Sequence, residues 1–71
     1  MKSYKRYPCQ VKLIRKFVSG HLKNMTYGEN MGFMSRKDAI TWAQSVSESP
    51  RVNYKVVSMT DIETEEFLYG S

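Results

Sequence analysis

The stretch GFMSRKDAITWAQSVSESPRVNYKVV, residues 32–57, places a helix between two strand-like runs and so decides the fold. Ser35 followed by Asp38 predicts the helix N-terminus, because side-chain oxygens at these positions accept hydrogen bonds from unpaired backbone N–H groups. Pro50 ends the helix, since the residue before a proline is disfavoured in the α conformation. At helical periodicity the apolar side chains fall in one arc. They are Ala39, Trp42, Ala43 and Val46, with Ile40 at the margin.

Two pairs of strands are predicted on either side of this helix. Residues 10–18 (QVKLIRKFV) are rich in β-branched and aromatic side chains, and residues 22–33 (LKNMTYGENMGF) alternate between apolar and small or polar ones. Gly20 is expected to take the positive φ of the turn between them. Residues 51–62 and 67–70 form the second pair. The prediction is an α+β fold with β-β-α-β-β order, a four-stranded antiparallel sheet with one helix packed on one face.

Length and composition limit what this chain can build. Its 71 residues, with 41% hydrophobic and 25% charged side chains, predict one globular domain over residues 1–71. Residues 1–8 are interpreted as a basic, flexible leader. A domain of this size buries only about 60% of the surface of its unfolded chain, which leaves no room for a deep pocket.

Membrane insertion and metal binding are not expected. Apolar runs are far shorter than the roughly 20 residues that a membrane span requires, and the N-terminus lacks the apolar core of a signal peptide. A cytoplasmic location follows as an expectation. Cys9 is the only cysteine and His21 the only histidine, which excludes an internal disulfide and a zinc site with four Cys/His ligands from one chain. Cys9 is interpreted as a structural thiol, and no cofactor is expected.

Charge is distributed unevenly along the chain. Residues 1–37 hold nine lysines and arginines against one glutamate, a net charge of +8. Residues 38–71 hold two basic residues against six acids, a net charge of −4. A domain with one basic and one acidic half has an oriented field that steers charged partners.

The loop between the first two strands fixes which side chains face the helix, because a one-residue slip exchanges the faces of a strand. A two-residue loop would place Lys16 opposite Lys23, so an odd loop is preferred. That loop places Leu13 opposite Tyr27. The side chains then expected on the helix side are Val11, Leu13, Phe17, Met25 and Tyr27. From the third strand, Tyr54 and Val56 are expected to face the helix next to Trp42 and Val46.

The sheet face opposite the helix, called the far face below, is the predicted binding surface. It is expected to be more apolar than a lone monomer presents to water, with lysines at its edge. The apolar residues assigned to it are Ile14, Val18, Leu22, Val57 and Met59, and the lysines are Lys12, Lys16 and Lys23. Three alternatives are considered for what covers this face: the leader or the tail of the same chain, a second copy in a homo-oligomer, or a different protein.

Enzymatic activity is not predicted. Catalysis needs paired carboxylates, an activated nucleophile or a metal cluster in a concave site, and the residues form none of these patterns. The sequence GENMG, residues 28–32, lacks the spacing of the phosphate-binding glycine motifs. Binding roles therefore remain, and a small-ligand role would need an oligomer to build a pocket.

Nucleic-acid binding is the alternative to protein binding. The leader interleaves basic and aromatic side chains that could supply phosphate contacts and base stacking. These residues are Lys2, Tyr4, Lys5, Arg6 and Tyr7. Against this alternative, the predicted far face is aliphatic, whereas an RNA-binding sheet presents aromatic side chains.

A resemblance in layout favours protein binding. The order of a hairpin, the helix SRKDAITWAQSV and the hairpin YKVVSMTDIETEEFL resembles small accessory proteins of phages and mobile elements, including some anti-CRISPR and other anti-defence inhibitors. The resemblance implies a non-catalytic inhibitor that occupies the surface of a host or defence protein. It carries no diagnostic motif, so no functional residue transfers from it. Several such inhibitors are acidic nucleic-acid mimics, and this basic chain differs from them.

Overall fold

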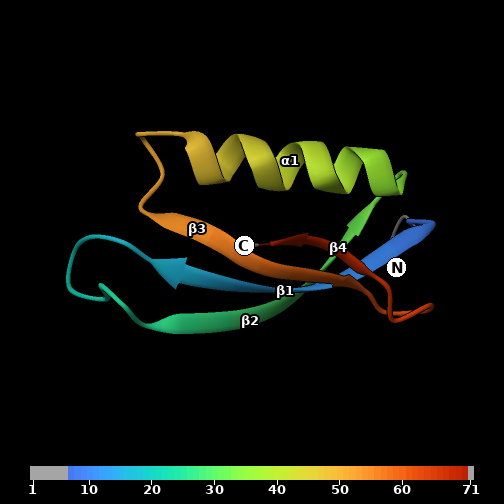
Figure 1. Ribbon diagram of the computed structural model, residues 1–71, viewed down its shortest axis with the longest axis horizontal. Helices are drawn as coiled ribbons and strands as arrows, with labels where there is room; N and C mark the ends of the chain where they lie inside the picture. The colour runs from blue at the N-terminus through green and yellow to red at the C-terminus, as the bar shows by residue number, and fades with distance from the viewer. Residues whose placement is uncertain (1–6, 71) are drawn as a thin grey trace, which may run out of the picture.

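A computed structural model describes residues 7–70 and contains four strands and one helix in the predicted order (Figure 1). The strands form one antiparallel sheet with the order β2-β1-β3-β4. The elements are β1 Cys9–Phe17, β2 Thr26–Phe33, α1 Arg36–Glu48, β3 Tyr54–Asp61 and β4 Phe67–Gly70. The predicted α+β fold is therefore confirmed.

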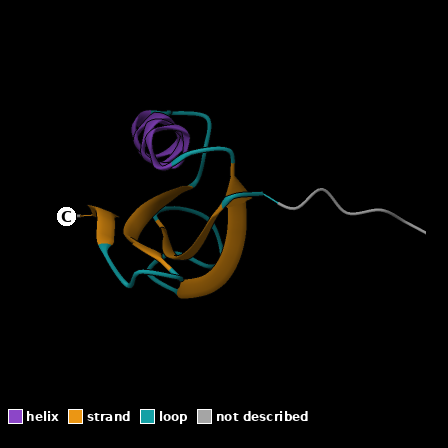
Figure 2. Cartoon of the chain, turned by 90° about the vertical axis from the view of Figure 1, so that its right-hand side faces the viewer, coloured by secondary structure: helices purple, strands orange, loops and turns teal. Residues whose placement is uncertain are grey.

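Helix α1 begins and ends where the local signals predict. The Ser35 hydroxyl accepts a hydrogen bond from the Asp38 backbone N–H at 3.1 Å, and Ser49 leaves the helical conformation at the C-terminus. Figure 2 shows the helix lying on one side of a strongly curved sheet. Ala39 and Ala43 are fully buried, because their small side chains let the helix approach the strands closely. Within residues 7–70, no helix has the length and apolar character needed to cross a bilayer.

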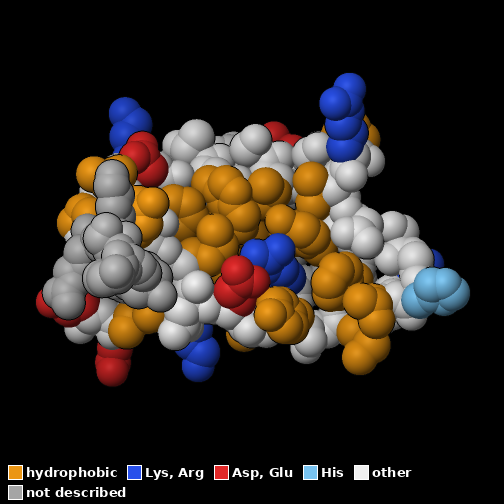
Figure 3. All heavy atoms as spheres, turned by 180° about the vertical axis from the view of Figure 1, so that it is seen from behind, with side chains coloured by type: hydrophobic (Ala, Val, Ile, Leu, Met, Phe, Trp, Pro, Cys, Tyr) orange, Lys and Arg blue, Asp and Glu red, His pale blue; other side chains and the backbone are white. Residues whose placement is uncertain are grey.

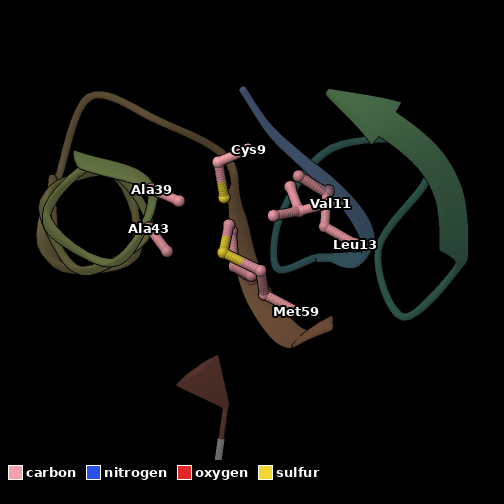
Figure 4. Packing of buried hydrophobic residues seen from close by; sticks show 7 residues of the cluster. Cys9, Val11, Leu13, Ala39, Ala43 and Met59 are labelled. Carbon is pink, nitrogen blue, oxygen red and sulfur yellow. The ribbon is translucent and has the colours of Figure 1, made fainter. Parts of the chain in front are cut away.

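The core lies between the helix and the two central strands. Val11 and Leu13 from β1 and Met59 from β3 are the largest fully buried side chains. Figure 4 shows them with Cys9, facing the two helix alanines. Burying an aliphatic side chain of this size stabilises the fold by about 1.5 to 3 kcal/mol.

The pairing of β1 with β2 corrects the predicted register. Arg15 lies opposite Tyr27 and Leu13 opposite Glu29, whereas Leu13 was predicted opposite Tyr27. The cause is the connection between the strands, which is longer than a tight turn and contains left-handed residues at Gly20 (φ 82°) and Asn24 (φ 73°). Because the register differs by two residues, each side chain keeps its predicted face.

A β-bulge in β3 corrects a second prediction. Ile14 pairs with Ser58 and Arg15 pairs with Val56, so Val57 is an extra residue in β3. A bulge reverses the alternation beyond it. Met59 was predicted on the far face, but this reversal brings it into the core beneath the helix, where it is fully buried.

Asp61 joins the start of the helix to the β3–β4 turn. Its carboxylate is buried and accepts hydrogen bonds from the backbone N–H groups of Glu63 (2.9 Å) and Thr64 (3.1 Å). The guanidinium of Arg36, in the first turn of α1, donates to the same carboxylate at 3.2 Å. The turn and the helix are thereby held together at one side chain.

The stability of the domain is expected to fall in acid through Asp61. The Thr64 N–H, followed by the Glu63 N–H and Arg36, lowers the pKa of Asp61 against an opposing contribution from burial. A carboxyl group whose pKa is lower in the folded state stabilises the fold at pH values above its unfolded-state pKa, which is near 4. This stabilisation is lost as the pH falls through the folded-state pKa. Urea unfolding measures the free energy of unfolding of the native protein and of Asp61→Asn between pH 7 and pH 2. The difference between the two values should narrow as the pH falls. A constant difference would contradict the assignment.

Candidate functional site

The helix leaves part of its own side of the sheet uncovered. Helix α1 packs mainly on β3, and the ends of β1 and β2 next to their connecting loop lie beyond it. Met25 and Tyr27 were predicted beneath the helix, but each is 55% exposed. Alternation alone places them on the helix side, and the path of the helix leaves them open to solvent.

These residues belong to what we call the apolar patch, a surface of aromatic and methionine side chains on the helix side of the sheet. In Figure 3, hydrophobic side chains gather around a small cluster of opposite charges. The Phe17 and Tyr54 rings meet edge to face with centroids 6.1 Å apart. The patch consists of Phe17, Met25, Tyr27, Met31 and Tyr54.

An ion pair lies within the apolar patch. Arg15 Nη2 is 2.8 Å from Glu29 Oε1, and the Arg15 side chain is only 16% exposed. Its guanidinium carbon lies 4.6 Å from the centroid of the Tyr54 ring, a cation–π contact. Arg15 Nε is buried without a hydrogen-bond partner among the described residues. Sequence reasoning assigned no role to Arg15, although its parity with Leu13 already placed it on this side.

The far face is more polar than predicted. Ile14 is half-buried there because it packs across Gly28, with its Cδ1 3.5 Å from the position that a Cβ would occupy. Val57, the bulge residue, is also half-buried. Lys12 and Lys16 are exposed on this face.

The remaining residues of the predicted binding surface lie apart from Ile14. Val18, Leu22 and Lys23 are exposed in the loop between β1 and β2. Met25 N–H donates to the Leu22 carbonyl at 2.8 Å, which ties this loop to the margin of the apolar patch. That the predicted set forms one interface stays a prediction.

Of the predicted leader set, only Tyr7 is described. Its side chain lies over Gly32 on the far face, where a Cβ on the glycine would come within 2.8 Å of Tyr7 atoms. Gln10 Nε2 donates to the Tyr7 carbonyl at 2.8 Å and fixes the backbone there. The other members, Lys2, Tyr4, Lys5 and Arg6, lie outside the described residues.

The titratable side chains offer little chemistry. Cys9 is buried, and burial, followed by the charge of Asp61, raises the pKa of its thiol against the opposing effect of Arg36. A raised pKa keeps the thiol protonated and therefore weakly nucleophilic. His21 is exposed in the β1–β2 loop. Across residues 7–70, no three metal-ligating side chains come together.

Comparisons of the chain with protein-family models, with curated proteins and with solved structures find no match. Functional inference for this chain therefore comes from its own surfaces. Two of them differ in chemistry and lie on opposite sides of the sheet: the apolar patch and the basic far face.

Proposed function

We propose that this domain is a non-catalytic module that binds a protein partner through the apolar patch. The observation that carries the proposal is the exposure of Met25 and Tyr27 beside the largely buried Arg15–Glu29 pair. A contiguous apolar surface with a polar surround is characteristic of an interaction site. Aromatic, methionine and arginine side chains are also the types enriched in protein interfaces.

Contacts within the chain hold the side chains at the centre of the patch. Arg15 is held by Glu29 and by the Tyr54 ring, and Tyr54 also contacts Phe17. Side chains that are already fixed lose less conformational entropy on binding, so more of the contact energy contributes to affinity. Val18 and Leu22 in the adjoining loop are also exposed.

Occupying the partner's surface is the mode of action in this proposal. It is supported by the resemblance of the layout to anti-defence inhibitors, which implies a host or defence protein as the partner. The buried, protonated Cys9 thiol and the exposed position of His21 support action without catalysis. A second copy of the chain is the competing occupant that the experiment must separate.

The proposal is tested by crosslinking from within the patch. A photoreactive phenylalanine at Tyr27 is expected to capture one protein from nuclease-treated bacterial lysate, while the same probe at Gln44, exposed on the outer side of α1, should not. The captured protein is then purified for titration. Because a single central interface residue contributes about 2 kcal/mol or more, Met25→Gln/Tyr27→Thr should weaken its binding by at least about thirtyfold.

The controls separate binding from folding and from self-association. Both substituted residues are largely exposed, so the double variant should melt within a few degrees of the native protein. Equal capture from Gln44, or unchanged affinity of the double variant, would refute the proposal. A product of twice the chain mass would show that the patch joins two copies instead.

A further inference from the structure

The far face carries lysines and no acidic strand residue. Strand pairing places Lys12, Lys16 and Lys55 on it, and the other far-face positions of β1, β2 and β3 are small or polar apart from Ile14 and Val57. Glu29 and Asp61, the acids within β2 and β3, pair with Leu13 and Val11 and so lie on the helix side. The two sides of the sheet therefore differ in charge.

Two of these lysines oppose each other directly. Lys16 pairs with Lys55 across β1 and β3, an arrangement that is unfavourable without a counter-charge. All three salt bridges among the described residues use Arg15 or Arg36, so none neutralises either lysine. Lys12 lies four residues along the same strand, about 13 Å from Lys16. A ligand with regularly repeated negative charges would neutralise these lysines.

Aromatic rings lie on the two sides of Lys12. Lys12 pairs with Thr60, and Thr60 pairs with Phe67, so these residues form one row across the far face. Phe67 is 65% exposed, and its ring lies 2.9 Å from the position that a Cβ on Gly70 would occupy. Tyr7, over Gly32 of β2, lies on the opposite edge. The two edge strands are about 14 Å apart, which leaves the lysine between the rings.

We propose that the far face binds single-stranded nucleic acid, with Lys12, Lys16 and Lys55 contacting phosphates and the Phe67 and Tyr7 rings stacking on bases. Binding of single strands combines a positively charged track with aromatic platforms, and this face supplies both. The face is an open sheet surface, whereas duplex reading requires a helix or a narrow ribbon that enters a groove. The proposal is independent of the apolar patch on the other side.

Fluorescence anisotropy with labelled fifteen-nucleotide oligo(dT) and oligo(U), and with a fifteen-base-pair duplex, tests this inference at 50 to 200 mM salt. Lys16→Gln/Lys55→Gln should weaken single-strand binding about tenfold and reduce the salt slope by about 1.4, since each single-strand phosphate contact contributes about 0.7. Phe67→Ala should weaken binding fivefold or more without changing the slope, because stacking involves no released counterion.

A matched control removes the same charge elsewhere. Lys37→Gln/Arg51→Gln alters two exposed positions on the helix and the following loop, and it should change affinity less than twofold. The Lys16→Gln/Lys55→Gln variant should melt no lower than the native protein, because it relieves repulsion between like charges. Met25→Gln/Tyr27→Thr should bind the oligonucleotides normally, which separates this site from the proposed protein site.

Several outcomes would overturn the inference. Absence of binding at 50 mM salt would do so, as would equal weakening by the Lys37→Gln/Arg51→Gln control. Tighter binding of the duplex would exclude a single strand as the ligand. If polyglutamate displaced the oligonucleotide as readily as unlabelled oligo(dT), the face would be a site for an acidic protein instead.

Discussion

Replacing Met59 by lysine is expected to unfold the domain, with loss of its native circular dichroism spectrum. Met59 is fully buried in β3, opposite Leu13 and beneath the helix. An unpaired ammonium group in this position costs several kcal/mol, in addition to the packing that is lost. A domain of 71 residues has a total stability of roughly 4 to 11 kcal/mol, so one such substitution removes much or all of it.

Two variants control for volume and for charge. Met59→Leu nearly preserves the side-chain volume and should cost less than about 1.5 kcal/mol. Thr60→Lys introduces the same charge one position later on the far face, next to Lys12, and should cost less than about 1 kcal/mol. If Met59→Lys folded as stably as Thr60→Lys, Met59 would face solvent, and the assignment of a bulge at Val57 would be wrong.

Trp42→Ala is expected to lower the free energy of unfolding by about 3 kcal/mol, the lower end for a large aromatic, because the indole is only half-buried. Its ring lies against Phe33, with centroids 5.6 Å apart and planes inclined by 48°. Tyr54, which the sequence predicts beside Trp42, meets the Phe17 ring edge to face, and no ring contact between Trp42 and Tyr54 is found among residues 7–70. Urea unfolding monitored by circular dichroism measures the loss.

A double-mutant cycle identifies the partner of Trp42. Trp42→Leu combined with Phe33→Leu should show a coupling of about 0.5 to 1.5 kcal/mol, as for other aromatic pairs. Trp42→Leu combined with Tyr54→Leu should be additive within about 0.5 kcal/mol. The reverse pattern would restore the contact that the sequence predicts.

The helix was predictable because its signals are local. Ser35 caps its own helix, Pro50 follows its end, and the arc with Ala39 and Ala43 depends only on helical periodicity. The faces of β1 and β2 were also predictable although the register was wrong. An error of two residues preserves parity, so Leu13 still faces the core.

The bulge and the loop were not predictable because they depend on contacts between distant segments. No side chain near Val57 marks an extra residue, and the bulge exists only relative to β1. The β1–β2 connection holds Asn24 in the left-handed conformation, which asparagine adopts several-fold more often than most residues but which an asparagine in the sequence does not by itself specify.

The two surfaces differ in how far the sequence could locate them. Alternation alone placed Lys12 and Lys16 together on the far face, but the opposition of Lys16 and Lys55 requires the register of β1 against β3. Phe67 reaches the far face through its pairing with Thr60, beside an irregularity in β4. The exposure of Met25 and Tyr27 depends on the path of α1 across the sheet, which helical periodicity does not specify.

The central position of β1 also governs how the chain folds. One edge of β1 pairs with β2, which follows it closely in the chain. The other edge pairs with β3, which is separated from β1 by residues 18–53. Closing so long a segment before its contacts form raises the contact order and slows folding relative to a helical bundle of equal size. A two-stranded hairpin is at best marginally stable in water, so β1 and β2 cannot persist alone. Folding is therefore a single cooperative event that requires both halves of the chain.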